Sequence, residues 1–282
     1  MQLYGRTNFL PPVVKNLILL NVIFFIAKYF LGDWDLDNLL GLHYPTSHYF
    51  KPFQFVTYMF MHANLMHILF NMYGLWMFGP ILENSLGSQK FMFYYLFTGI
   101  GAAIFHLCIS YFNIAPFEHA LADFINSPNL DQLNVMTQKY IPREAMISIN
   151  DVPVNVKDHL TSVISQWTNN ASNTSQYVKE STEIFNLILS SMTDVPLVGA
   201  SGALFGILIA FGVLYPMVDL YIFFIPVPIK AKWLVLGYGL IELVMGIVNS
   251  KGDDVAHFAH LGGMLFGFIL LYYWRKTSNR VW

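Results

Sequence analysis

The sequence predicts an all-α, polytopic membrane protein, a bundle of six transmembrane helices with a large outer-side insert between helices 3 and 4. Of its 282 residues, 55% are hydrophobic and only 11% are charged, whereas soluble domains carry about 25% charged residues. Aromatic residues make up 17% of the chain, and many stand near the ends of apolar runs, as in the interfacial belts of membrane proteins. Six segments approach or reach the roughly 20 apolar residues that a spanning helix needs.

The six segments are runs of apolar residues separated by polar loops. The fourth is short, and the second and sixth contain histidines, so hydropathy alone would rank these three lowest. The segments are 13–31, 53–78, 91–112, 199–215, 233–248 and 256–274.

Lysine and arginine placement predicts that both termini are cytoplasmic. The short outer loops that follow the first and fifth segments carry only Lys51 and Lys251. Cytoplasmic loops carry the excess of basic residues in membrane proteins. No small-residue cleavage site follows the first apolar run, so we expect it to be a retained helix. The basic residues at the predicted cytoplasmic ends are Arg6, Lys15, Lys90, Lys230, Lys232, Arg275, Lys276 and Arg280.

Residues 113–194 form the predicted outer-side (extracytoplasmic) insert within a single membrane domain of residues 1–282. The insert contains four prolines, which are followed by a more helical stretch. A structureless loop of this length would be unusual. We therefore expect one or two amphipathic helices, which could lie on the membrane face.

Charge and cysteine content exclude several classes of function. The net charge of −2 and the lack of a basic patch give no reason to propose a nucleic-acid partner. The single cysteine, Cys108, excludes an intramolecular disulfide and a cysteine-based zinc site.

Polar side chains at membrane depth are costly and mark candidate functional sites. Taken alone, those in the second segment are better explained by hydrogen bonds that hold helices together. His67 and Asn71 are four residues apart and share one helix face. The candidates are His62, His67 and Asn71 in the second segment, Ser201 at the start of the fourth, and His257 and His260 in the sixth.

Ser201 and His260 each stand just ahead of a G-x-x-x-G pattern. Small residues at this spacing let helix backbones approach closely, which could bring a serine and an imidazole within the 2.6–3.2 Å that activates a nucleophile. Ordinary helix packing is the alternative explanation. Phe205 lies on the same helix face as Ser201 and could pack on the imidazole, although spacing alone favours a core role. The glycines are Gly202, Gly206, Gly263 and Gly267.

Four sequence blocks together resemble the rhomboid family of intramembrane serine proteases. The resemblance covers most of the chain but not the insert, whose length departs from the minimal form. A Trp-Arg pair often found ahead of the second helix reads Phe53-Gln54 here, so the sequence departs from the family pattern in the outer loop. The blocks are GASG (199–202), HANLMHILFN (62–71), LENSLGSQKF (82–91) and AHLGG (259–263).

The resemblance implies a serine endopeptidase, a hydrolase that cleaves transmembrane segments of membrane proteins. Ser201 would be the nucleophile and His260 the general base. The side chains of His67 and Asn71 would form an oxyanion hole with the backbone N–H of Ser201. We expect no cofactor and no metal, membrane-protein substrates, and a site open to the extracytoplasmic side of the membrane, most simply a bacterial inner membrane. The oligomeric state stays open.

Further residues match supporting positions of the family. Glu83, placed in the loop after the second segment, would brace that loop. Gly199 would leave room beside the active site, and Gly263 would let the helices that carry Ser201 and His260 pack closely. His62 would support the outer loop.

The sequence predicts a Ser-His dyad without a third carboxylate. Asp253 and Asp254 precede His260 by only a few residues and should lie in the outer loop, so packing would orient the imidazole. An intramembrane metalloprotease is an alternative because the chain has several histidines, but the H-E-x-x-H signature is missing. A non-catalytic rhomboid-like protein that binds membrane clients is the second alternative.

Overall fold

The computed structural model describes residues 10–32, 34–149, 152–221, 227–248 and 256–277. It confirms the all-α class, with two short strand pairs added. The chain divides into two compact units, one comprising Met1–Ile109 with Pro196–Trp282 and the other Ser110–Val195.

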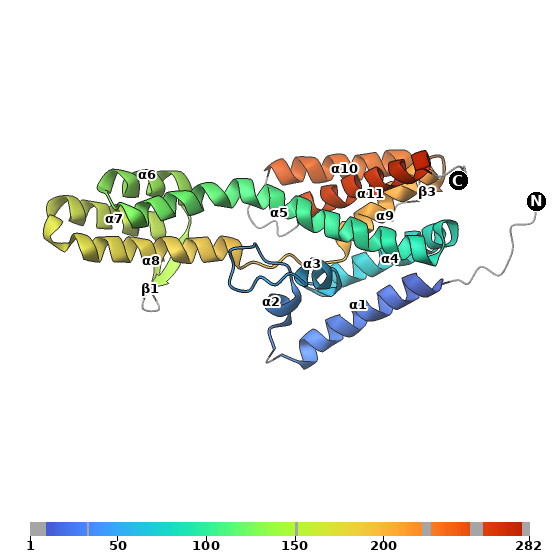
Figure 1. Cartoon of the computed structure of the whole chain (residues 1–282), viewed down its shortest axis with the longest axis horizontal. Helices are drawn as coiled ribbons and strands as arrows, with labels where there is room; N and C mark the ends of the chain where they lie inside the picture. The colour runs from blue at the N-terminus through green and yellow to red at the C-terminus, as the bar shows by residue number, and fades with distance from the viewer. Residues whose placement is uncertain (1–9, 33, 150–151, 222–226, 249–255, 278–282) are drawn as a thin grey trace, which may run out of the picture. The chain divides into compact units, whose positions relative to one another are not determined.

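The first unit contains the helices that correspond to the six predicted segments. Within it α11 packs against α9 and α10, and α1 packs against α4 (Figure 1). Its elements are α1 (Pro12–Phe30), α2 (Leu36–Leu40), α3 (Gln54–Thr57), η1 (Tyr58–Phe60), α4 (Leu65–Leu86), the first part of α5 (Ser88–Asn126), α9 (Ser201–Leu214), β3 (Asp219–Leu220), β4 (Ile229–Lys230), α10 (Ala231–Val248) and α11 (His257–Thr277).

Four of the described helices, α1, α4, α5 and α10, are long and apolar enough to cross a membrane. Helix α9 is apolar but has only 14 residues, or about 21 Å at 1.5 Å per residue. That is shorter than the roughly 30 Å hydrocarbon core of a bilayer. The number of six crossings therefore stays a prediction.

The second membrane helix starts later than its apolar run suggested. Residues 54–60 form α3 and η1, and α4 begins only at Leu65. Asn64 fixes this start because its side chain accepts a hydrogen bond from the His67 N–H at 2.9 Å. An asparagine in this position satisfies a backbone donor that the first turn leaves open.

Glycines bring three helices of the first unit together. A β-carbon on Gly202 would lie 2.6 Å from Ala102 Cβ, and one on Gly206 would lie 2.5 Å from Thr98 Cβ, so both α9 glycines make room for α5. The predicted close approach of α9 and α11 is produced mainly by the α11 glycines. A β-carbon on Gly263 would overlap the Gly202 carbonyl oxygen.

The second unit has a hydrophobic core of its own. Phe124, Leu160 and Phe185 are fully buried in this core. The amphipathic faces of its helices pack on one another, and contact of this unit with a membrane face stays a prediction. Its elements are the last part of α5, α6 (Leu130–Tyr140), the antiparallel pair β1 (Met146–Ile149) and β2 (Val152–Asn155), α7 (Val156–Asn169), η2 (Ala171–Asn173) and α8 (Thr174–Thr193).

Candidate active site

Ser201 is the first residue of α9, and the segment before it is fixed by backbone hydrogen bonds. Leu197 and Leu42 exchange two such bonds of 2.9 and 2.8 Å, and the Gly199 N–H donates to the Tyr58 carbonyl at 2.9 Å. The first N–H groups of a helix have no partner within the helix. The backbone N–H of Ser201 belongs to this set and is oriented by the start of α9.

His260 lies next to Ser201. Its Nε2 atom is 2.8 Å from the Ser201 Oγ, which is hydrogen-bond distance. His260 is buried in the first turns of α11. The approach depends on Gly263, which lets the α11 backbone contact the carbonyl of Gly202 in the first turn of α9.

Phe205 packs on the imidazole of His260. The two ring centroids are 4.2 Å apart and the ring planes differ by 7°. The contact joins the second turn of α9 to the first turns of α11. Phe205 therefore limits rotation of the His260 ring, whereas spacing alone favoured a core role for it.

The prediction that no carboxylate contacts His260 is wrong. An oxygen of Glu242 in α10, Oε2, lies 2.9 Å from His260 Nδ1 and 2.6 Å from His257 Nδ1. The signal for Glu242 was present in the sequence as a lone acidic residue in an apolar run. Only Asp253 and Asp254, which are close to His260 in sequence, were considered as a third member, and they were set aside as outer-loop residues; both lie outside the described residues.

His67 lies beside the turn that leads into Ser201. A β-carbon on Gly199 would be 2.7 Å from His67 Nε2 and 3.5 Å from Ser201 Oγ, and Gly199 has a φ of +127°. Glycine is therefore required here both for backbone conformation and for space. The His67 imidazole and the Ser201 hydroxyl border the same space around Gly199.

Asn71 lies one helical turn after His67 on α4. Asn71 is only 4% exposed, and among the described residues its Nδ2 atom has no hydrogen-bond partner. A buried donor without a partner costs about 1–3 kcal/mol and calls for an explanation. A donor reserved for a bound group would explain it.

His62 is fully buried ahead of α4. Its ring meets that of His67 edge to face, with centroids 5.0 Å apart. Burial, followed by the neighbouring His67, lowers the pKa of His62 to about 3. The His62 ring is therefore neutral at physiological pH and packs against His67.

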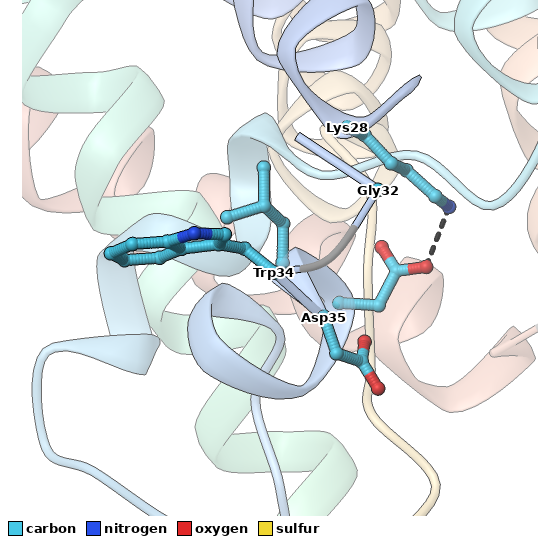
Figure 2. Close-up of a pocket in the computed structure, with 6 residues that line it drawn as sticks. Lys28, Gly32, Trp34 and Asp35 are labelled. Atoms are coloured by element: carbon cyan, nitrogen blue, oxygen red, sulfur yellow. Dashed lines mark ion pairs between the residues drawn. The ribbon is translucent and has the colours of Figure 1, made fainter. Parts of the chain in front are cut away.

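Lys28, near the end of α1, binds the chain just ahead of α4. Its ammonium donates to the carbonyls of His62 at 3.1 Å and Ala63 at 3.3 Å. Figure 2 shows the ion pair that it also makes with Asp37, at 2.5 Å, beside a pocket that Trp34 and other residues line. Lys28 thus fixes the segment that enters α4 four residues before His67.

Glu83 lies inside α4 and not in the loop after it, which corrects its expected place. Its carboxylate accepts hydrogen bonds from the backbone N–H groups of Val13 at 3.0 Å and Val14 at 2.8 Å, and from Ser88 Oγ at 2.6 Å. Pro11, the N-cap residue of α1, supplies no side-chain cap. Glu83 therefore caps α1 from a neighbouring helix.

Gln54 is fully buried. Its Oε1 atom accepts from the backbone N–H groups of His43 and Lys51, and its Nε2 atom donates to carbonyls that include that of Tyr49 at 2.9 Å. The neutral amide of Gln54 therefore holds the segment between α1 and α4 in place through hydrogen bonds to its backbone.

The histidines that motivated a metalloprotease reading do not gather into one site. Among the described residues, the cluster with metal-ligand spacing is Glu242, His257 and His260, whose donor atoms lie within 4.8 Å of one another. Both histidines of this cluster contact the same carboxylate oxygen through Nδ1. His62 and His67 are not part of it.

Comparison with known proteins places the chain in a family. The model of the Rhomboid domain matches residues 49–115 and 162–277, which is more than half of the chain. A protein named rhomboid protease GlpG from Yersinia pestis (strain Pestoides F) is 29% identical over 98 residues, which are 33% of this chain and 35% of that protein. One of the same name from Klebsiella pneumoniae is 34% identical over 79 residues, 28% of this chain and 29% of that protein.

The chain thus spans about a third of the length of these two curated relatives. The ranges matched by the family model contain Ser201, His260, Glu242, His67 and Asn71. Helices that are long and apolar enough to cross a membrane agree with this match and identify an integral membrane protein. The chain belongs to the rhomboid family.

Proposed function

We propose that this chain is an intramembrane serine endopeptidase that cleaves transmembrane segments of other membrane proteins. The observation that carries the proposal is the 2.8 Å contact between Ser201 Oγ and His260 Nε2. Family membership supports it, as does the name rhomboid protease given to the relatives. The proposal makes the chain a hydrolase that needs no cofactor.

In the proposed reaction, Ser201 Oγ attacks the carbonyl carbon of the scissile peptide bond. The Oγ–H bond breaks, and its proton moves to His260 Nε2 while the Oγ–carbon bond forms. Breakdown of this intermediate returns the proton from Nε2 to the leaving amine. Water then hydrolyses the acyl-enzyme by the same proton path. The substrate helix must unwind locally, because helical carbonyls are hydrogen-bonded and shielded.

The developing oxyanion would be stabilised by the backbone N–H of Ser201 and the side chains of His67 and Asn71. The buried, unpartnered Nδ2 of Asn71 supports this role, as does the position of His67 against Gly199. Donors held in place before the reaction stabilise the charge at little reorganisation cost.

The orientation of the chain belongs to the same proposal. Lysines and arginines favour cytoplasmic termini, with the site and residues 113–194 on the outer side of a bacterial inner membrane. The bacterial relatives fit this membrane. Reporter fusions at both ends and within the insert would test the topology, since an outer-side reporter signal at either terminus contradicts it.

The test is cleavage of a purified model transmembrane substrate in proteoliposomes. Wild type should cleave, whereas Ser201→Ala and His260→Ala should not. Ser190→Ala and His119→Ala, at exposed positions of the second unit, are matched controls and should retain activity. Equal cleavage by wild type and Ser201→Ala would overturn the proposal. A wild type that binds the substrate without cleaving it would favour the non-catalytic alternative.

A further inference from the structure

Glu242 is placed unusually for an acidic residue in a membrane helix. It is 8% exposed, whereas its neighbours Ile241 and Leu243 are 57% and 43% exposed. The other buried residues of α10 are Ala231 and Val235, and Val235 is seven residues, or about two turns, before Glu242. The carboxylate therefore projects from the one buried stripe of a helix that is otherwise largely uncovered.

The carboxylate completes a chain of contacts that ends at Ser201. Glu242 Oε2 lies 2.9 Å from His260 Nδ1, and His260 Nε2 lies 2.8 Å from Ser201 Oγ. A carboxylate accepts hydrogen bonds, so the proton of a neutral His260 belongs on Nδ1. The lone pair of Nε2 then faces the Ser201 hydroxyl, which is the tautomer that a general base needs.

We propose that Glu242 is a positioning residue that extends the Ser201–His260 pair into a triad. This inference rests on the proposed function. When the Ser201 proton moves to Nε2, the imidazole becomes a cation and Glu242 stabilises it while remaining ionised, so no proton moves to the carboxylate. The carboxylate lies close enough to His260 Nδ1 to stabilise the new positive charge by Coulomb attraction.

His257, three residues before His260 in α11, contacts the same carboxylate of Glu242. Its Nδ1 atom lies 2.6 Å from Glu242 Oε2. The same carboxylate oxygen is therefore within hydrogen-bond distance of the imidazoles of both His257 and His260. His67 of α4 and His106 of α5 also interact electrostatically with His260. Glu242 is the one acidic group among these neighbours in the described part of the chain and therefore provides the opposing negative charge.

The experiment uses the full chain in proteoliposomes and measures kcat, KM and the pH profile of cleavage for Glu242→Gln. The amide keeps the shape but removes the charge. We expect kcat to fall at least about tenfold with KM nearly unchanged, since the lost interaction acts mainly in the transition state. The rising limb of the kcat/KM profile should move to lower pH, because the imidazolium loses its counter-charge and the neutral base persists at lower pH.

Three further variants separate positioning from structure. Glu242→Asp restores the charge and should recover part of kcat and the wild-type position of the rising limb. His257→Gln removes the second partner and should keep most of the activity. Glu183→Gln, at an exposed acidic residue of α8, is the matched control and should behave as wild type. The rate at which a serine-directed phosphonate labels the protein gives a second readout if substrate turnover becomes too slow.

The outcomes distinguish this inference from the proposed function. If Glu242→Gln has the kcat and pH profile of the wild type while Ser201→Ala is inactive, the triad is overturned but the proposed protease function stands. If Glu242→Gln has a lower Tm but an unchanged rising limb of the pH profile, Glu242 only links α10 and α11 structurally, and the triad is overturned as well. Loss of activity in a chelator with recovery in Zn²⁺ would replace the triad by a metal at Glu242, His257 and His260. Active Ser201→Ala would overturn the proposed function itself.

Discussion

Gly263 of α11 faces the backbone carbonyl of Gly202 of α9 so closely that a β-carbon on Gly263 would overlap the carbonyl oxygen. Backbone cannot move aside as a flexible side chain can, so the separation of the two helices is set by this contact. The contact lies one turn from His260 and next to Ser201. Helix packing and the geometry of the candidate catalytic pair are therefore coupled.

Gly263→Ala should push α11 away from α9 and lengthen the distance from His260 to Ser201. A displacement of about 1 Å costs on the order of 10²-fold in rate, and we expect such a loss in cleavage together with a lower Tm. Gly237→Ala is the control, because a β-carbon there has nothing within 4 Å. Wild-type cleavage by Gly263→Ala would show that the helices do not need this contact.

Gly199→Ala should disturb the oxyanion side of the site. Its φ of +127° disfavours any side chain, and the new methyl group would lie 2.7 Å from His67 Nε2. Backbone strain of this kind costs about 1–3 kcal/mol, so Tm should fall, and kcat should fall because His67 must move. Thermal unfolding and steady-state cleavage measure the two effects. Unchanged kcat with a lower Tm would remove His67 from the oxyanion hole.

Asn71→Ala should slow catalysis without weakening the fold. Its Nδ2 has no hydrogen-bond partner in the described part of the chain, so deleting the amide breaks no hydrogen bond of that atom there. Loss of one oxyanion donor costs about 2.7–4 kcal/mol of transition-state stabilisation, or about 10²–10³-fold in kcat. Cleavage rates and Tm of wild type and variant check this. A lower Tm with wild-type kcat would make Asn71 a structural residue.

Glu83→Ala should weaken the fold without slowing catalysis, which is the opposite of the effect expected for Asn71→Ala. It removes the acceptor of the Val13 and Val14 N–H groups and leaves the start of α1 uncapped. Hydrogen bonds to charged groups contribute about 1.5–3 kcal/mol each, so we expect a clearly lower Tm and nearly unchanged kcat for the folded fraction. Glu183→Ala, on the exposed surface of α8, should leave Tm unchanged. A loss of kcat at unchanged Tm would assign Glu83 to the chemistry instead.

The sequence predicted the features that depend on local pattern. Long apolar runs predicted α1, the first part of α5 and α10, whereas the continuation of α5 to Asn126 was missed. The G-x-x-x-G spacing after His260 predicted close packing against α9. The start of α4 was missed because residues 53–64 are apolar on average, whereas the boundary depends on the side chain of Asn64. Hydropathy does not detect a single capping hydrogen bond.

Features that depend on distant partners could not be predicted in the same way. Glu242 precedes His260 by 18 residues and reaches it only because α10 and α11 pack together. Glu83 contacts residues 69 and 70 positions away, which no spacing within one helix reveals. The core of residues 110–195 also forms between amphipathic faces whose pairing the sequence leaves open.

Labelling with a fluorophosphonate, followed by mass spectrometry of the peptides, tests the central claim most directly. The reagent reacts with a serine that an adjacent base activates. We predict modification of Ser201 in the wild type, strong loss of labelling in His260→Ala, and none in Ser201→Ala. Labelling of another serine, or equal labelling of wild type and His260→Ala, would contradict the assignment of Ser201 and His260 as nucleophile and base.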